Sequence, residues 1–185
     1  MALLIPVIGI WLHTWLKGRF VIVCALLIAC FAMLTIQRNE VWASPIRLWQ
    51  DTCQRSPQKP RPHLNLASAM LQSGKVQEAE VLFFEMIQMA PEYVESYINL
   101  AQIETNRGNL DKALLYSDQA VSVNPGFDVA NLQNGFLHDR MGHRDQAIKS
   151  FRIWLLTHPN DIFIINRIKF LQHRDAINGV SEIQQ

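Results

Sequence analysis

The sequence predicts an all-α protein: an N-terminal transmembrane helical hairpin, then an α-solenoid of three helix-turn-helix repeats with a C-terminal capping helix. Two observations carry this prediction. Proline, glycine and alanine each recur at a spacing of 34 residues between positions 57 and 159, and a fixed period of that length is typical of stacked helical pairs. The first 36 residues, by contrast, contain only two charged side chains, Lys17 and Arg19.

Each repeated residue has a physical reason to recur. A glycine between the two helices of a repeat adopts a left-handed cap at no steric cost, and a proline after the second helix ends it. Small residues near the helix centres let the paired helices approach closely. We therefore place the repeats at residues 60–93, 94–127 and 128–161. The columns are Pro57, Pro91, Pro125 and Pro159; Gly74, Gly108 and Gly142; Ala79, Ala113 and Ala147; and Ala67, Ala101 and Gly135.

The period and the columns resemble those of the tetratricopeptide repeat (TPR) family over residues 60–161. This resemblance implies an α-solenoid whose first helices line a groove. Two positions depart from the pattern. Ser117 stands where the first and third repeats have phenylalanine, and Asn134 stands where the first two have leucine. We expect both departures to weaken packing locally.

Residues 1–37 are predicted to form a membrane anchor. Residues 20–36 are uncharged, and 17 residues of helix reach about 25 Å, near the lower limit for a span. The more N-terminal apolar stretch, residues 2–16, is shorter and could be a second span or a tilted or interfacial helix. The polar segment 17–19 is then the turn of a hairpin.

Two processing events are alternatives to a retained anchor. A cleaved signal peptide needs a basic start, which residues 1–16 lack. The segment 27–30 resembles a bacterial lipobox with Cys30 as the lipidated residue. Apolar sequence continues past Cys30 to residue 36, which favours an uncleaved helix. The three cysteines do not settle the redox compartment.

Residues 38–59 are predicted to be a juxtamembrane connector with an N-terminal capping helix. Trp42 and Trp49 suit the membrane interface, where an indole N–H stays hydrated. Ser44 followed by Pro45 is typical of a helix start. Ile46, Trp49 and Cys53 would then share one face, which we expect to pack on the first repeat.

Residues 162–185 are predicted to be a capping helix, ending near residue 177, and a mobile tail. This helix carries more apolar residues than one buried stripe accommodates. We expect part of it to remain available to a partner, unless both of its sides are buried in the array. The apolar residues are Ile162, Phe163, Ile164, Ile165, Ile168, Phe170 and Leu171.

The sequence contains no recognisable catalytic motif, metal site or cofactor site. No two histidines have the i, i+4 spacing that presents two ligands on one helical face, and Cys-x-x-Cys is absent. His138 and His143 flank a turn glycine and are read as a chance pair. The net charge of +1 argues against a nucleic-acid binder.

The remaining candidate site is the groove formed by the first helices. Some TPR domains hold a partner's terminal carboxylate with lysine and asparagine there, but apolar residues dominate here, so we expect a helix or an extended apolar segment, from a partner or from this chain's own C-terminus. The predicted groove residues are Leu64, Ser68, Leu71, Ile98, Gln102, Leu132 and Phe136. The same predicted face also carries Arg61, Glu95, Thr105, Val129 and Asp139.

Residues 35–51, 56–57 and 61–67 lie at the junction between anchor and repeats, and residues 38–42 have the pattern Arg-Asn-x-x-Trp. This junction resembles that of bacterial polytopic membrane proteins similar to TPR-bearing protein O-mannosyltransferases, where such an element leads from the last membrane helices into periplasmic repeats. Residues 1–36 contain no Asp or Glu, so the acidic catalytic residues of that family are missing. The sequence therefore predicts a membrane-anchored TPR adaptor, a non-catalytic subunit or assembly factor of an integral-membrane complex. Alternatives are a non-catalytic, acceptor-presenting part of a glycosyltransferase system and a periplasmic chaperone similar to the TPR factors of cytochrome c maturation.

The expected location is a bacterial inner membrane with the repeats in the periplasm. Lys17 and Arg19 place the interhelical turn in the cytoplasm by the positive-inside rule. Basic residues also follow the second apolar segment, so charge alone is ambiguous, and the resemblance favours the periplasm. The expected partners are membrane-complex subunits and lipid, not nucleic acid.

Overall fold

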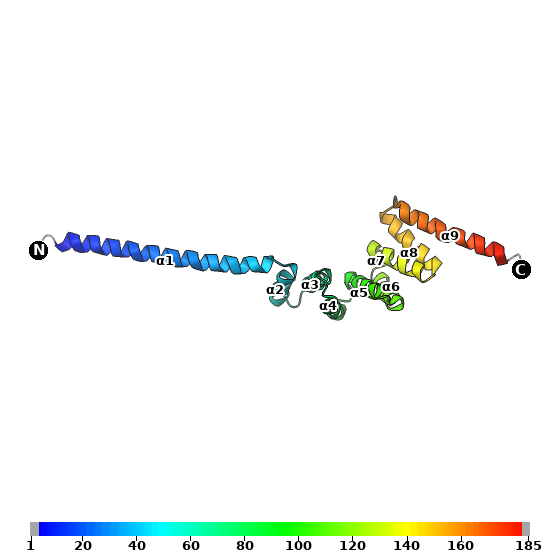
Figure 1. Ribbon diagram of the computed structural model, residues 1–185, viewed down its shortest axis with the longest axis horizontal. Coiled ribbons are helices and arrows are strands. Elements are labelled where there is room, and N and C mark those ends of the chain that lie inside the picture. The colour runs from blue at the N-terminus through cyan, green and yellow to red at the C-terminus, as the bar shows by residue number, and fades with distance from the viewer. Residues whose placement is uncertain (1–3, 183–185) are drawn as a thin grey trace. The chain divides into compact units, whose positions relative to one another are not determined.

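The computed structural model describes the backbone of residues 4–182 and the side chains of residues 19–39 and 41–173. Within that part the regular elements are α1 to α9, all of them helices (Figure 1). The all-α prediction is therefore confirmed. The chain divides into two compact units, Met1–Asp51 and Thr52–Gln185, which are considered separately below.

The first unit contains α1, Leu4–Trp42, a single helix of 39 residues. It runs through residues 17–19 without a break, so the predicted hairpin is not supported. A glycine inside a helix costs only about 1 kcal/mol relative to alanine, which is too little to force a turn in a long run of helical backbone. Residues 1–3 of the predicted anchor lie outside the described residues.

One part of α1 could cross a membrane by length and composition. Among the described residues this is Arg19–Asn39, 21 residues that no other part of the protein buries. Phe20 and Ile28 are 70% and 69% exposed. Signal sequences near an N-terminus have the same properties, so the anchor remains a prediction.

The end of α1 and the start of α2, Pro45–Arg55, are joined by polar contacts. The Arg38 guanidinium lies 3.0 Å from the Asp51 carboxylate and 5.8 Å from the centre of the Trp42 ring. The backbone N–H of Leu48 donates to the Ser44 carbonyl, and Pro45 is the first helical residue, as predicted. The placement of Trp42 and Trp49 at a membrane interface stays a prediction, as does packing of α2 on the first repeat.

After the last residues of α2, the second unit contains three helix pairs and a final helix (Figure 1). The turn glycines Gly74, Gly108 and Gly142 have φ of 81°, 82° and 79°, which confirms the predicted left-handed caps. The pairs are α3 Pro60–Gln72 with α4 Val76–Met89, α5 Val94–Arg107 with α6 Leu110–Val123, and α7 Asp128–Arg140 with α8 Arg144–Thr157; α9 is Ile162–Glu182.

The small-residue columns lie where the paired helices meet. Ala67 and Ala101 are completely buried. At Gly135 an added Cβ would lie 2.6 Å from the Phe151 ring, so only glycine allows that ring to fill the core. The first repeat has Phe83 at the equivalent place, also fully buried.

The two departures from the repeat pattern are both buried. Ser117 has no exposed surface, and its hydroxyl has no hydrogen-bond partner. Asn134 has two partners: its amide donates to Asp118 at 2.7 Å, and its carbonyl accepts from the Ser150 hydroxyl at 2.8 Å. The expected weakening therefore applies to Ser117, whereas polar partners compensate for Asn134.

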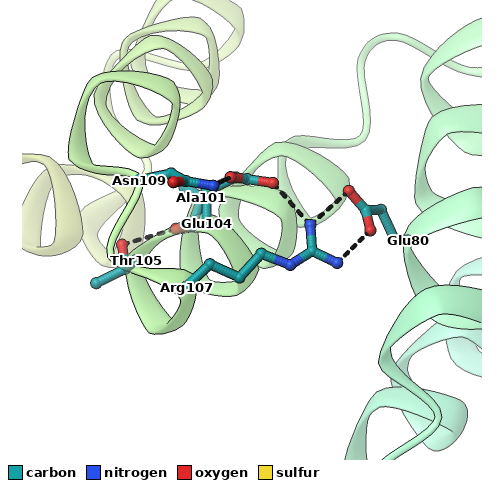
Figure 2. Close-up of polar contacts among 6 residues, drawn as sticks. All are labelled: Glu80, Ala101, Glu104, Thr105, Arg107 and Asn109. Carbon is teal, nitrogen blue, oxygen red and sulfur yellow. Dashed lines mark hydrogen bonds and ion pairs between the residues drawn. The ribbon is translucent and has the colours of Figure 1, made fainter.

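A charged network connects the first repeat to the second (Figure 2). Arg107 binds Glu80 through two hydrogen bonds of 2.9 and 2.6 Å, and it also donates to Glu104 at 2.8 Å. Asn109 donates to the other Glu104 oxygen at 2.7 Å. These bonds, the one from Asn109 first, lower the pKa of Glu104 despite its burial, so the carboxylate is held ionised. Burial is the main cause that raises the pKa of Tyr116 nearby.

The final helix, α9, buries one stripe and exposes another. Ile164, Ile168 and Leu171 are buried in a core with Phe151. Phe163 and Phe170 are 67% and 51% exposed, so the apolar excess remains at the surface, as predicted. The helix continues past residue 177 to Glu182, and residues 183–185 of the predicted tail lie outside the described part.

Candidate partner-binding groove

A hollow of about 300 Å³ lies between α5 and α7, the first helices of the second and third repeats. The hydrogen bond from the Gln133 side-chain amide to the Ile98 carbonyl, 3.1 Å long, connects the two helices. Leu137 is buried beneath, while Ile98, Leu132 and Phe136 are half-buried. The lining residues are Ile98, Gln102, Thr105, Val129, Leu132, Gln133, Phe136, Leu137 and Arg140.

A second hollow, of about 390 Å³, adjoins the first where α9 contacts α7. Phe136 lines both hollows, and its ring centre lies 6.2 Å from that of Phe163. It also meets Phe151 edge-on at 5.1 Å, which fixes the ring between the core and the surface. We call the surface formed by the two hollows the α5–α7–α9 groove. The second hollow is lined by Phe136, Asp139, Phe163, Asn166, Arg167 and Phe170.

Most of the charge on this surface is paired. Arg167 binds Asp139 through two hydrogen bonds of 2.6 and 2.8 Å, which raise the pKa of the guanidinium. The Arg167 guanidinium also lies 5.0 Å from the centre of the Phe170 ring. Arg140, at the rim of the first hollow, has no ion pair with any residue whose side chain the structure describes.

The structure brings together four of the seven predicted groove residues: Ile98, Gln102, Leu132 and Phe136. Those of the first repeat do not line either hollow. Leu64 is only 3% exposed and belongs to the core, against which Leu71 packs. The Ser68 hydroxyl donates to the Leu64 carbonyl. Leu64 is therefore a core residue and not a surface for a partner.

Several groove residues were not predicted. Arg140 lies four residues after Phe136 on α7 and so shares its helical face, a spacing that could have identified it. Phe163 and Phe170 belong to the apolar excess of the final helix, but the sequence does not show that they adjoin Phe136. That contact depends on how α9 packs.

The reactive side chains of the described region do not converge on the groove. No group of three or more His, Cys, Asp or Glu side chains there could hold a metal ion. His138 and His143 do meet, with their Nδ1 atoms 3.3 Å apart, and burial lowers the pKa of His138. Burial raises the pKa of the Cys53 thiol, which disfavours the nucleophilic thiolate.

The helix pairs form an α-solenoid of the kind built by tetratricopeptide repeats. Proteins with such repeats are generally non-catalytic adaptors. Residues 94–127, the second predicted repeat, match the tetratricopeptide repeat family. The helix pairs on either side repeat its geometry, so the TPR prediction is confirmed for the fold.

Particular solved structures share this fold. A crystal structure of MamA matches with a TM-score of 0.59 and 18% identity over 71% of this chain and 77% of that one. A thermophilic TPR protein of Thermus thermophilus matches with a TM-score of 0.53 and 24% identity, over 66% and 69%. The first TPR of Spaghetti (RPAP3), bound to the HSP90 peptide SRMEEVD, matches with a TM-score of 0.57 and 18% identity, over 64% and 94%.

A curated relative is the Protein CTR9 homolog of Arabidopsis thaliana. It is 24% identical over 155 residues, which are 80% of this chain. The chain spans only 14% of the length of that relative. At this identity the likeness does not extend to the relative's function.

Proposed function

We propose that this chain is a membrane-anchored TPR adaptor that docks a helix of a partner protein in the α5–α7–α9 groove. It would serve as a non-catalytic subunit or assembly factor of an integral-membrane complex. The observation that carries the proposal is the apolar surface around Phe136, which two hollows share and on which no reactive groups converge. Protein-binding grooves of this kind accept the apolar face of an amphipathic helix.

The membrane part of the proposal is supported by α1. The 21 residues Arg19–Asn39 are helical and uncovered by protein, and no charged residue lies between Arg19 and Arg38. A span of that length matches the hydrocarbon core. An anchor would raise the effective concentration of the repeats near membrane partners. Extraction of membranes with alkaline carbonate tests this: release of the full chain into the supernatant would exclude a spanning helix.

We further propose a bacterial inner membrane with the repeats on the periplasmic side. The support is the pair of cations before the apolar segment, Lys17 and Arg19, together with the resemblance of residues 35–67 to a periplasmic junction. A reporter that is active only in the periplasm, fused after Trp49, should be active. Activity only of a cytoplasmic reporter would reverse the orientation.

The adaptor function is tested by a matched pair of substitutions. Val129→Glu places a charge in the first hollow, at a side chain 47% exposed, so the fold should tolerate it. Leu156→Glu makes the same kind of change on α8 at a side chain 80% exposed that lines neither hollow. Full-length variants are purified from native membranes, and the co-purified proteins are quantified by mass spectrometry.

A partner recovered in fixed ratio with wild type and Leu156→Glu, and lost with Val129→Glu, is the expected result. A partner retained by Val129→Glu would exclude the groove as its docking site. Co-isolation with a polytopic transferase would favour the glycosyltransferase alternative. Many clients at low occupancy would favour the chaperone alternative.

A further inference from the structure

The groove has chemical features that specify its occupant more closely. Resting on the adaptor function above, we propose that the partner segment is an acidic amphipathic helix. Its apolar face would cover the surface around Phe136, and a carboxylate within one turn of its apolar anchors would pair with Arg140.

The backbone of the groove argues for a helix instead of an extended segment. The walls are α5, α7 and α9, whose internal N–H and C=O groups bond within each helix, so no strand edge is offered for pairing. An extended peptide laid on Leu132, Phe136 and Phe163 would leave its own backbone groups unsatisfied against apolar side chains, which is costly. A helix satisfies those groups internally and presents only side chains.

The charges of the groove argue for an acidic partner. One of its two arginines, Arg167, is already neutralised by Asp139, at 2.6 Å. Arg140 is left without an ion pair among the described side chains. A helix that covered the first hollow would desolvate this guanidinium, and an unpaired buried charge opposes binding. A carboxylate restores its interactions through charge-assisted, bidentate hydrogen bonds.

The position of Arg140 limits where that carboxylate can lie. Arg140 follows Phe136 by four residues on α7, a rise of about 6 Å along the helix. Phe136 is the side chain common to both hollows, so an apolar anchor of the partner contacts it. A carboxylate that reaches Arg140 must therefore lie about one turn from that anchor.

A peptide selection tests this inference on the full-length chain in lipid nanodiscs. The probe is a displayed library of 18-residue helical peptides with leucine at spacings of three and four and with the flanking positions randomised. It is selected separately against wild type, Arg140→Glu, and the control Arg152→Glu, which changes an exposed arginine on α8 that does not line the groove. Arg140→Gln, a neutral variant, provides a second test in case charge reversal perturbs the fold.

The expected result is enrichment of Asp or Glu one turn from the leucines with wild type and with Arg152→Glu. That preference should be lost with Arg140→Gln and reversed toward Lys or Arg with Arg140→Glu. For the best wild-type peptide, Arg140→Glu should weaken binding about tenfold or more, and changing the peptide's acid to lysine should restore it.

Different results would overturn the acidic partner and the apolar docking groove. Peptides that bind through their leucines, lose affinity with Val129→Glu and show no charge preference would overturn the acidic partner while supporting the apolar groove. No library peptide bound above background by wild type, or binding unaffected by Val129→Glu, would overturn both.

Discussion

The junction between repeats one and two and the junction between repeats two and three occupy equivalent places in the solenoid but are built differently. The first buries Phe83, Met86 and Leu100 in one apolar core and adds the Arg107 network beside it. The second contains Ser117 at the position equivalent to Phe83, and Asn134 links Asp118 to Ser150. The apolar cluster of the second junction is built on smaller residues, with Ala120 and Ala130 buried beside Val94 and Tyr97, and its polar bonds lie inside the helix packing instead of beside it.

The same repeat column also has different roles in the two places. Leu64 is 3% exposed in the first repeat, whereas its equivalents Ile98 and Leu132 are half-buried and line the groove. The proposed binding surface therefore lies over the more polar junction. The position of a residue within a repeat therefore determines the direction of its side chain. The neighbouring side chains determine whether it is buried in the core or remains accessible to a partner.

The largest expected effect comes from the aromatic column. Phe83→Ala should lower the free energy of unfolding of the second unit by about 3–5 kcal/mol, because a fully buried ring leaves a cavity. Ser117→Ala, at the equivalent position, should raise it by about 1 kcal/mol, because the substitution removes a buried hydroxyl without a partner. Denaturant unfolding of the full chain in detergent, followed by circular dichroism, measures both. Equal losses for the two variants would contradict the difference between the junctions.

An intermediate effect is expected from the charged network of the first junction. Glu104→Ala should cost about 2 kcal/mol, because this carboxylate is 4% exposed and accepts charge-assisted bonds from Arg107 and Asn109. The matched control is Glu95→Ala, which breaks the exposed pair with Arg61 and should cost less than about 1 kcal/mol. The same unfolding assay compares them, and a Glu104 variant no less stable than the Glu95 variant would show that the network is dispensable.

The repeats were predictable because their constraints are local and recur. The left-handed glycine, the proline that ends a helix and the small residue where two helices cross each recur at a spacing of 34 residues. The predicted hairpin is not supported by the structure, because a polar Lys-Gly-Arg segment, which composition alone favours as a turn, is equally compatible with a continuous helix. In that case no repeated pattern was available to decide between the two.

The groove was predictable only in part, for a different reason. Periodicity placed Ile98, Leu132 and Phe136 on one face, but it could not show that Leu64 would be covered or that Phe163 would adjoin Phe136. Contacts between distant helices determine both outcomes. Asn134 likewise hydrogen-bonds to Asp118 and Ser150, each 16 positions away in the sequence. The residue pattern of a single repeat does not predict these bonds.

The smallest effect expected is a pH dependence confined to the second junction. Burial lowers the pKa of His138, outweighing Asp118 on α6, which raises it, while His143 at the start of α8 lowers it further. The unfolded chain, with an ordinary histidine pKa of about 6.5, then binds a proton that the folded state resists. This contribution to stability is fully present when the pH is above the unfolded-state pKa of His138. It is lost as the pH falls from there toward the lower pKa of His138 in the folded state.

Unfolding is compared at pH 7.5 and pH 5.5. Carboxylates do not contribute to the difference, because an ordinary carboxyl pKa is about 4.3 and that of Glu104 is lowered in the folded state. His138→Gln should reduce the loss of stability between the two pH values, whereas the control His173→Gln, an exposed site on α9, should leave it unchanged. Comparing the change between two pH values cancels any pH-independent cost of the substitution. An identical loss in wild type and His138→Gln would mean that the polar junction is no more sensitive to acid than the rest of the molecule.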